Sequence, residues 1–276
     1  MKPAIPAGVL ADLPVETQVA PLLGALEGIG LEELNATAAL QTRIDRKYLV
    51  PATTFARLFG SFDADMRVLD TGGLRIFRYD SVYFDTPALD SYFLAAHGRR
   101  RRYKIRTRSY LDSGVSFLEV KTEGSRSATV KERIPYSPAD RSTITAEGAQ
   151  YIAETLGSTG QAPPSQLAPV LETLYGRITL FLPASNSRAT IDLNVAWSLP
   201  GQAPLVMANQ VVVETKSGSA PGQLDRHLWH HGIRPSRISK FATGLATLMP
   251  DLPANRWHRT LRHNMPQPTH RARTTP

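Results

Sequence analysis

The chain has 276 residues, which is enough for one large domain or two small ones. Hydrophobic residues make up 42% of it and charged residues 20%, so it has the material for a sizeable core and is not an intrinsically disordered chain. The net charge of +8 favours polyanionic partners such as nucleic acid, anionic membranes or phosphate-rich small molecules, and the absence of cysteine excludes disulfides, thiolate metal sites and a cysteine nucleophile.

The first half of the chain changes from helical to strand-like periodicity. Residues 15–40 carry apolar residues near helix spacing, which predicts a helical segment. From about residue 43 to residue 135 the dominant period is two. This pattern predicts a strand in "RIDRKYLV" and further strands at residues 74–85, 102–110, 114–122 and 128–136. A helix follows within residues 138–158, and we expect it to begin near Thr145.

A proline-rich linker, "QAPPSQ", opens the second half. A mixed segment comes next, followed by predicted strands at 188–197 and 209–217 and predicted helices at about 222–231 and 239–248. The last stretch is basic and proline-rich without a periodic apolar pattern, which indicates a flexible tail. The best hydrophobic candidate for a membrane span contains Glu172 and Arg177, and the N-terminus lacks a signal-peptide apolar run. We therefore expect a soluble, cytoplasmic protein.

The stretch "RRRRYKIRTRSY" (99–110) has a basic residue at every second position from residue 100 to residue 108. Successive side chains of a strand point to opposite faces, so these cations share one face. The other predicted strands repeat this pattern. Their ionic face carries ten basic residues against four acids: Arg43, Lys47, Lys104, Arg106, Arg108, Lys121, Lys131, Arg133, Arg188 and Lys216 against Asp45, Glu119, Asp192 and Glu214.

Two structures would explain such a face. In an open antiparallel sheet it would be the solvated face, but solvated sheets usually interleave the two signs of charge to limit repulsion. Alternatively, the sheet closes into a barrel with the apolar face outward under helices, and the ionic face lines a tunnel. Cations facing one another across a tunnel are tolerable only where anions neutralise them.

The sequence narrows the class of anion. Single-stranded RNA would require stacking aromatic residues, and the ionic face offers only Tyr110 and Phe117, so we expect no specific nucleic-acid partner. No phosphate-binding P-loop motif is present. A linear oligophosphate needs many point charges and a divalent metal, for which the minority carboxylates are suitable oxygen ligands.

The order of several motifs resembles a known family. "RIDRKY", "SVYFDT", "YFLAAHGRRRRYKIRTRSY", "FLEVKT", "VKERIPY", "RATIDLN", "VVVETKS" and "RISKF" follow one another as in the VTC domain, over about residues 40 to 248. That domain is the polyphosphate polymerase module of the vacuolar transporter chaperone family and one of the triphosphate tunnel metalloenzymes, a CYTH-like superfamily. The resemblance implies an α+β fold: a closed antiparallel β-barrel of about eight strands that forms a tunnel and is flanked by helices.

The resemblance also implies roles for individual residues. The phosphate-gripping, catalytic positions are Lys47, Arg106, Arg108, Lys121, Lys131, Arg133, Arg188 and Lys240. Glu214 matches the metal-coordinating glutamate, and the other acids of the ionic face are further candidate metal ligands: Glu119, Asp192 and Asp45. Additional substrate contacts are expected from Lys104, Lys216, Arg43 and Ser239, the last of which could cap a helix whose free N–H groups bind phosphate.

The expected domains are an N-terminal helical segment packing on the barrel (1–39), the tunnel domain (40–252) and the basic tail (253–276). Hydrolytic tunnel enzymes typically begin with "ExExK", and the corresponding residues here are Arg43-Ile44-Asp45-Arg46-Lys47. An arginine in place of one acid favours gripping phosphate over activating water, although Asp45 keeps hydrolysis open.

The resemblance therefore implies a polyphosphate polymerase that uses Mn²⁺ or Mg²⁺ to transfer the γ-phosphate of ATP, or another nucleoside triphosphate, onto a polyphosphate chain. A tripolyphosphatase or nucleoside triphosphatase, and a non-catalytic polyphosphate-binding module, are the alternatives. Polyphosphate or pyrophosphate is then the second ligand, and a membrane-protein partner stays open.

Overall fold

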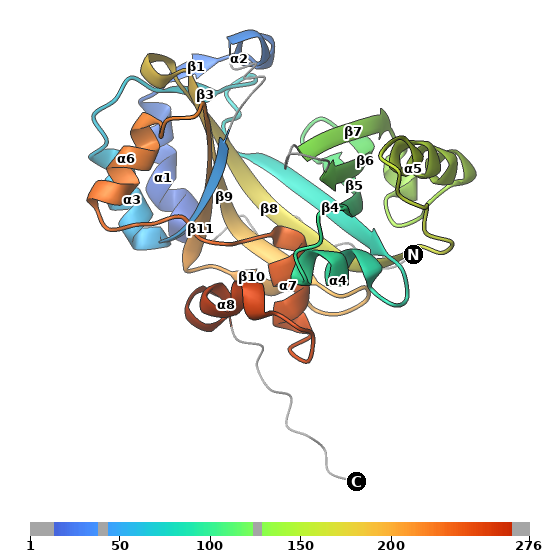
Figure 1. The fold of residues 1–276 in the computed structure, drawn as a ribbon. Helices are drawn as coiled ribbons and strands as arrows, with labels where there is room; N and C mark the ends of the chain where they lie inside the picture. Colours follow the sequence, from blue (N-terminus) through green and yellow to red (C-terminus); the bar gives the residue numbers. More distant parts are fainter. Residues whose placement is uncertain (1–13, 38–43, 124–128, 267–276) are drawn as a thin grey trace.

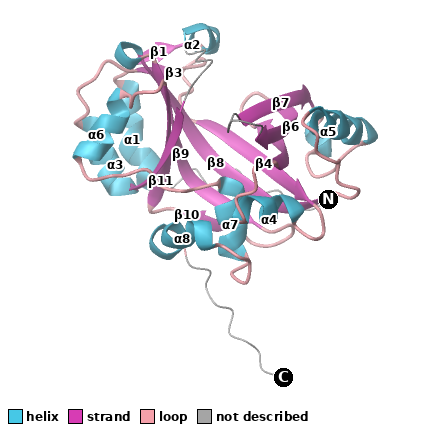
Figure 2. Cartoon of the chain, viewed as in Figure 1, coloured by secondary structure: helices cyan, strands magenta, loops and turns pink. Residues whose placement is uncertain are grey.

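An antiparallel sheet of eight successive strands organises the molecule. The computed structural model describes residues 14–37, 44–123 and 129–266. The hydrogen-bonded order is β2 (Ile44–Pro51), β11 (Gln210–Ser217), β9 (Ser187–Ser198), β8 (Ala168–Leu182), β4 (Phe77–Asp85), β5 (Arg102–Tyr110), β6 (Val115–Glu123) and β7 (Thr129–Pro135). Every neighbouring pair on this path is antiparallel. The predicted α+β class, an antiparallel sheet flanked by helices, is confirmed (Figure 2).

Three short strands extend the sheet: β1 (Glu27–Ile29) pairs parallel with β3 (Arg67–Leu69), β3 also pairs with β8, and β10 (Leu205–Met207) pairs with β9. The predicted helical segment over 15–40 consists of two helices, α1 (Pro14–Gly24) and α2 (Leu31–Thr37), with β1 between them. Glycines interrupt the pattern here, and each weakens a helix. At Gly28 a Cβ would lie 3.1 Å from the Asp70 Cβ, so close approach to the next segment also requires glycine.

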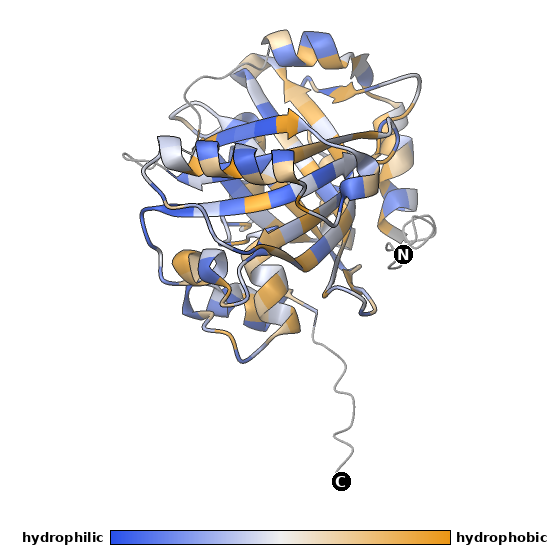
Figure 3. Cartoon of the chain, turned by 90° about the vertical axis from the view of Figure 1, so that its right-hand side faces the viewer, coloured by the Kyte–Doolittle hydropathy of each residue, from blue (hydrophilic) through white to orange (hydrophobic). Residues whose placement is uncertain are grey.

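The mixed segment after the proline-rich linker forms β8, which at 15 residues is the longest strand. It lies between β4 and β9 and is buried along most of its length. A strand covered on both faces carries apolar residues at odd and even positions alike, which hides the period-two pattern. Hydrophilic and hydrophobic positions alternate visibly in several other strands (Figure 3).

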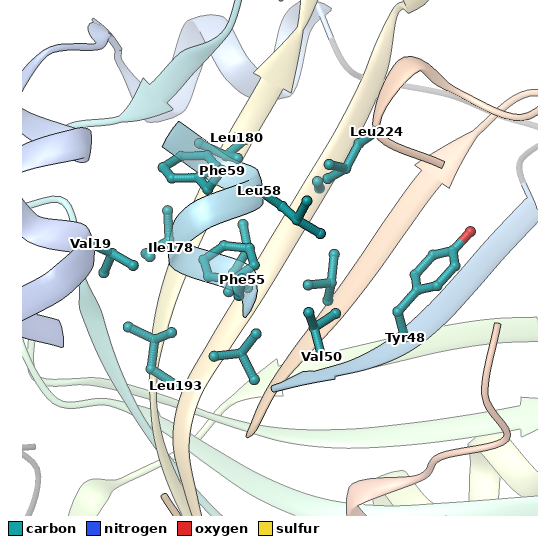
Figure 4. Packing of buried hydrophobic residues seen from close by; sticks show 14 of the residues in the cluster. Val19, Tyr48, Val50, Phe55, Leu58, Phe59, Ile178, Leu180, Leu193 and Leu224 are labelled. Carbon is teal, nitrogen blue, oxygen red and sulfur yellow. The ribbon is translucent and has the colours of Figure 1, made fainter. Parts of the chain in front are cut away.

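Two groups of helices cover the outer face of the sheet. On one side α1, α3 (Ala52–Gly60) and α6 (Gln223–His230) pack over β2, β11, β9 and β8, around residues such as Phe55, Ile178 and Leu224 (Figure 4). On the other side α5 (Ala146–Ser158) packs over β5 and β6 through Ile152 and Leu156. The Thr145 hydroxyl accepts the Gly148 N–H at 3.1 Å, which confirms the predicted start of this helix.

The opposite face of the sheet is partly covered by α7 (Lys240–Leu248) and α4 (Asp90–Ala96). Phe241 and Leu245 of α7 pack with Tyr175 and Trp197 of the sheet. The Ser239 hydroxyl accepts the Ala242 N–H at 3.2 Å, so the predicted cap is present. Short 3-10 turns lie at η3 (Pro138–Asp140) and η4 (Pro183–Ser185).

We expect Gly244→Ala to lower the melting temperature. A Cβ at Gly244 would lie 2.2 Å from Trp197 Cδ1, so α7 or the indole ring must move. Overpacking of this kind costs about 1–3 kcal/mol and outweighs the roughly 0.5–1 kcal/mol that alanine gains over glycine inside a helix. Thermal unfolding measures the difference. Gly157→Ala in α5 is the matched control, since nothing lies within 4 Å of its Cβ position, and it should leave the melting temperature unchanged or higher.

The prediction of a flexible tail from residue 253 is wrong as far as residue 265. The 3-10 turn η5 (Asn255–Trp257) and α8 (His258–Asn264) follow α7. Trp257 and Met265 are buried against the cluster around α7, and these two isolated apolar residues gave no periodic signal in the sequence. Residues 267–276 lie outside the described part of the chain. No helix in the described ranges combines the length and apolar character needed to cross a bilayer.

The sheet is strongly curved, and β11 and β7 stand on opposite sides of the space in front of β8 (Figure 1). Among the described residues β2 and β7 form no strand pair, so closure into a barrel is not confirmed. A flat sheet would nevertheless hold β2 about 29 Å from β6, six strand spacings away. The two sides instead approach each other closely enough for one short segment, Ser236 to Ser239, to hydrogen-bond both β2 and β5. In keeping with this, the charge of Lys47 on β2 lowers the pKa of Lys121 on β6.

The segment before α7 helps to bridge these two ends. The Ser236 N–H donates to the Lys47 carbonyl of β2 at 2.7 Å. Three residues later, the Ser239 hydroxyl accepts a hydrogen bond from Lys104 Nζ of β5 at 3.2 Å. Contacts of a loop thus connect the two sides of the curved sheet.

Candidate functional site

The strand register places the predicted cations and carboxylates on one side of the sheet, which we call the inner face. Directly opposite residues of antiparallel strands share a face. Opposite pairs are Lys47–Glu214, Asp45–Lys216, Lys216–Arg188, Asp192–Arg177, Arg106–Glu119, Glu119–Arg133, Lys104–Lys121 and Lys121–Lys131. Arg108 lies on the same face, and Ser239 and Lys240 reach it from the start of α7. Arg43 lies outside the described residues.

Glu119 is the centre of the first charge cluster. Its carboxylate accepts two hydrogen bonds from the Arg106 guanidinium, at 2.9 and 2.6 Å, and one from Lys131 Nζ at 3.2 Å. Burial acts to raise the pKa of Glu119, but Arg106, Arg108 and Lys131 outweigh burial and hold the pKa far below its usual range. Glu119 therefore stays ionised and fixes the direction of Arg106, whose remaining donor reaches the Tyr83 hydroxyl at 3.0 Å.

Asp192 is the centre of the second cluster and is fully buried. Arg177 donates to both of its oxygens, at 2.5 and 2.9 Å, and Lys240 Nζ contacts the same carboxylate. Burial acts to raise the pKa of Asp192, and the two cations lower it below the usual value. Lys240, predicted to reach phosphate, is thus held by a carboxylate of β9.

Glu214 and Asp45 form the third cluster, around Lys216. Lys216 Nζ lies 3.0 Å from the Asp45 carboxylate and also contacts Glu214, whose other oxygen is 3.8 Å from Lys47 Nζ. Burial acts to raise the pKa of Glu214, but Lys47 and Lys216 hold it well below its usual value. Two hard oxygen donors that already share one cation have the chemistry that Mg²⁺ and Mn²⁺ prefer.

The four predicted metal ligands differ in their suitability for a divalent ion. No three His, Asp or Glu side chains in the described ranges are arranged to hold a metal by themselves. Glu119 and Asp192 are each bound by an arginine and a lysine, which leaves little capacity for another cation. Glu214 is paired as well, with Lys47 and Lys216, but it shares Lys216 with Asp45, so two carboxylates meet around one cation there. This pair therefore fits a divalent ion better, provided that phosphate oxygens and water complete the coordination.

Lys104 and Lys121 stand opposite each other and form no ion pair with any described residue. Burial and then Lys121 depress the pKa of Lys104 well below the ordinary value. The Lys121 side chain is exposed, but the protein around it still displaces water from the ammonium group. This desolvation, and next the positive charge of Lys47, lowers the pKa of Lys121 to about 8. These two ammonium groups would gain most from a bound anion.

The pH dependence of anion binding follows from these lowered pKa values. Because both lysines bind protons less readily in the folded chain, the free energy of unfolding should rise as pH increases from about 8 towards the ordinary lysine pKa of 10.5. Anion affinity should fall over the same range, because the lysines lose their charge. The phosphates of ATP are already ionised above pH 7, so at pH 8.5 binding of ATP should take up protons from buffer.

Calorimetry at pH 8.5 in two buffers of different ionisation enthalpy measures this proton uptake. Lys121→Arg, which stays charged, should reduce the uptake and flatten the affinity profile between pH 7.5 and 9. The same heat in both buffers for the unmodified protein would contradict the prediction.

Aromatic residues underlie the cations of the inner face. The Arg108 side chain is only 8% exposed; it donates to the Tyr175 hydroxyl at 3.1 Å and lies over the Tyr79 ring at 5.5 Å. Arg177 lies 5.1 and 5.2 Å from the ring centres of Tyr79 and Tyr175. These contacts hold the guanidinium groups at fixed positions in a desolvated environment, where cation–π attraction is strongest.

Sequence reasoning missed Arg177 and these tyrosines. The signal was present in "TLYGRITL", where Thr173, Tyr175, Arg177 and Thr179 alternate with small or apolar residues, but the segment was not assigned as a strand. The position of Asn194 also differs from what the strand periodicity predicts. Period two would place it beside Asp192, but the β8–β9 register shifts between Leu174 and Gly176, and Asn194 donates to Glu16 of α1 at 3.2 Å.

The fold and the site define an α+β protein with a curved antiparallel sheet and a cation-rich inner face. The profile of the VTC domain matches residues 42–249. The chain therefore belongs to the VTC domain family, as the motif order indicates.

Similar solved structures include a putative adenylyl cyclase from Hippeastrum with a dominant triphosphatase activity, at 15% identity over 76% of this chain and 97% of that chain, with a TM-score of 0.46. A conserved hypothetical protein from Pyrococcus furiosus (14% identity, TM-score 0.36) and a protein from Pyrococcus horikoshii (13%, 0.33) each cover 69% of this chain and 88% of their own. No curated protein sequence matches the chain.

Proposed function

We propose that this chain is a metal-dependent polyphosphate polymerase, which transfers the γ-phosphate of ATP or another nucleoside triphosphate to the end of a polyphosphate chain on the inner face. The observation that carries the proposal is the pair Lys104–Lys121, two facing cations without a carboxylate partner among the described residues, in a face that Lys47 approaches from the far end of the sheet. Membership of the VTC domain family supports the same conclusion.

The proposed reaction is an in-line displacement at the γ-phosphorus. The terminal oxygen of polyphosphate forms the new P–O bond, the bond to the β-phosphate oxygen breaks, and the nucleoside diphosphate leaves with that electron pair. A terminal phosphate is ionised near neutral pH, so no general base is required. Lys104, Lys121, Lys131 and Arg106 would neutralise the charge on the transferred group and hold the reacting oxygens in line.

A divalent ion, Mn²⁺ or Mg²⁺, would be held by Glu214 and Asp45 together with phosphate oxygens. When bound, it supplies charge neutralisation and orientation of the phosphates. Lys216 and Lys47 keep Glu214 ionised and so preserve its negative charge for the ion.

A phosphohydrolase is the second candidate, and Asp45 favours it. This exposed carboxylate binds Lys216 together with Glu214 and would orient a water molecule towards a phosphate. The polymerase requires that the polyphosphate terminus, and not water, reaches the γ-phosphorus.

Product analysis tests the proposal. Purified protein is incubated with ATP and Mn²⁺ or Mg²⁺, and the products are resolved by gel electrophoresis and phosphorus NMR. Long phosphate chains are expected; orthophosphate alone identifies a hydrolase, and saturable binding without turnover identifies a binding module. A Lys104→Gln/Lys121→Gln double variant should lose the activity. Arg259→Gln is the matched control, because Arg259 is exposed on α8, outside the strands that carry the site.

A further inference from the structure

A row of aromatic rings crosses four neighbouring strands on the inner face. Tyr175 of β8 stacks on Tyr79 of β4, with ring centres 5.3 Å apart and planes at 6°. Tyr79 contacts Tyr110 of β5 at 4.9 Å, and Tyr110 meets Phe117 of β6 edge-on at 5.9 Å. The guanidinium of Arg133 on β7 closes the row, 4.1 Å from the centre of the Phe117 ring.

Burial decreases along this row towards the edge of the sheet. Tyr175 and Tyr79 are buried within the cluster around α7, Tyr110 and Phe117 are half-buried, and Arg133 is exposed. Tyr110 packs against that cluster, whereas no hydrophobic cluster in the described residues includes Phe117. A core role therefore explains the inner half of the row but not the outer half, where the guanidinium of an exposed arginine lies 4.1 Å from the centre of the half-buried Phe117 ring.

The outer half of the row lies beside the phosphate-gripping residues. Phe117 is directly opposite Arg108, and Glu119, which holds Arg106 and Lys131, is the next residue of β6 on the same face. Along β6 the strand rise puts Phe117 about 13 Å from Lys121. An extended nucleoside triphosphate could therefore place its base at Phe117 and direct its phosphates towards Lys121.

We propose that Tyr110, Phe117 and Arg133 form the binding site for the base of a nucleoside triphosphate, with Arg133 contacting the base and not the phosphates that the motif order leads one to expect for it. The inference rests on the proposed function and specifies how its donor substrate is oriented. The base stacks on Phe117 and Arg133, and Tyr110 supports the Phe117 ring through an edge-on contact. Every base has a π-face, so stacking alone does not select one base, and the site should accept ATP and GTP alike. A single platform of this kind suits one base, whereas RNA would require several.

The test compares ATP and GTP analogues that cannot be hydrolysed with inorganic tripolyphosphate, using calorimetry in the presence of Mg²⁺. Phe117→Leu keeps an apolar side chain but removes the ring, and Arg133→Lys keeps the charge but removes the plane. Each variant should raise the Kd for both nucleotides by at least about fivefold and that for tripolyphosphate by less than about twofold. Val130→Ala is the control, because Val130 is exposed on β7 opposite Thr122, on the outer face.

The outcomes separate this inference from the proposed function. Equal loss of nucleotide and tripolyphosphate affinity, or no loss of either, in folded variants overturns the base site and leaves phosphate binding intact. The base site is also overturned if the unmodified protein binds tripolyphosphate but does not bind the nucleotides. Binding of neither ligand to the unmodified protein refutes the proposed function itself. If Phe117→Leu shows a lowered melting temperature, the affinities of the Arg133→Lys variant alone decide between these outcomes.

Discussion

Glu214→Gln is expected to lower metal-dependent phosphoryl transfer by more than about 100-fold, since loss of even an outer-shell partner of a metal ligand costs about 10- to 100-fold. Glutamine keeps the shape of the side chain but supplies no negative charge for a divalent ion. The fold should survive, because Lys216 retains Asp45 and the partly exposed Lys47 can turn towards solvent. Initial rates measured against Mn²⁺ and Mg²⁺ concentration give the result.

Glu132→Gln is the matched control for this variant. Glu132 is exposed on β7 opposite Val120, which places it on the outer face of the same sheet. Its replacement should change neither the rate nor the metal requirement. A Glu214→Gln enzyme with undiminished rate and the same metal dependence would remove Glu214 from the mechanism.

Asp192→Ala is expected to destabilise the protein by about 3–5 kcal/mol. Asp192 is fully buried and is the shared partner of Arg177 and Lys240, so its removal leaves two cations without compensation in a desolvated site. For a chain of this size the melting temperature should fall by about 10 °C. Added tripolyphosphate should recover more stability in the variant than in the unmodified protein, because the anion supplies the missing negative charge.

The same variant separates a structural role for Asp192 from a metal-binding role. A structural Asp192 predicts a lower melting temperature with an unchanged metal concentration for half-maximal activity. An unchanged melting temperature together with a raised metal requirement would contradict the assignment and restore Asp192 as a ligand. Asp192→Asn, which still accepts hydrogen bonds from Arg177, should lie between the alanine variant and the unmodified protein.

The strand pattern was predictable because the inner and outer faces have opposite chemistry. In β5, Lys104, Arg106 and Arg108 alternate with Tyr103, Ile105 and Thr107, and a one-residue shift would bury the charges under α5. The cap residues Thr145 and Ser239 were predictable for an equally local reason, since their hydroxyls satisfy N–H groups within the first turn of the helix.

Features that depend on contacts distant in the sequence could not be found in this way. Strand β8 is buried along most of its length and carries apolar residues on both faces, so the short alternation at residues 173–179 was not recognised as a strand and Arg177 was missed. Which carboxylate meets which cation depends on the register between strands: Asp192 finds Arg177 across β8–β9 and Lys240 from α7, far along the chain. The sequence identified the four acids but could not distinguish the two that are each held by an arginine and a lysine from the two that share Lys216.

The contact between the two ends of the sheet through a loop affects how the molecule can deform. Prising apart neighbouring strands on the path would break a ladder of main-chain hydrogen bonds, whereas no such ladder joins β2 to β7 in the described ranges. The segment before α7 can separate from the sheet only if the Ser236–Lys47 and Lys104–Ser239 hydrogen bonds break. The two ends of the sheet can therefore separate here at the cost of few main-chain hydrogen bonds, so an extended ligand would reach the inner face from the side and need not enter from one end.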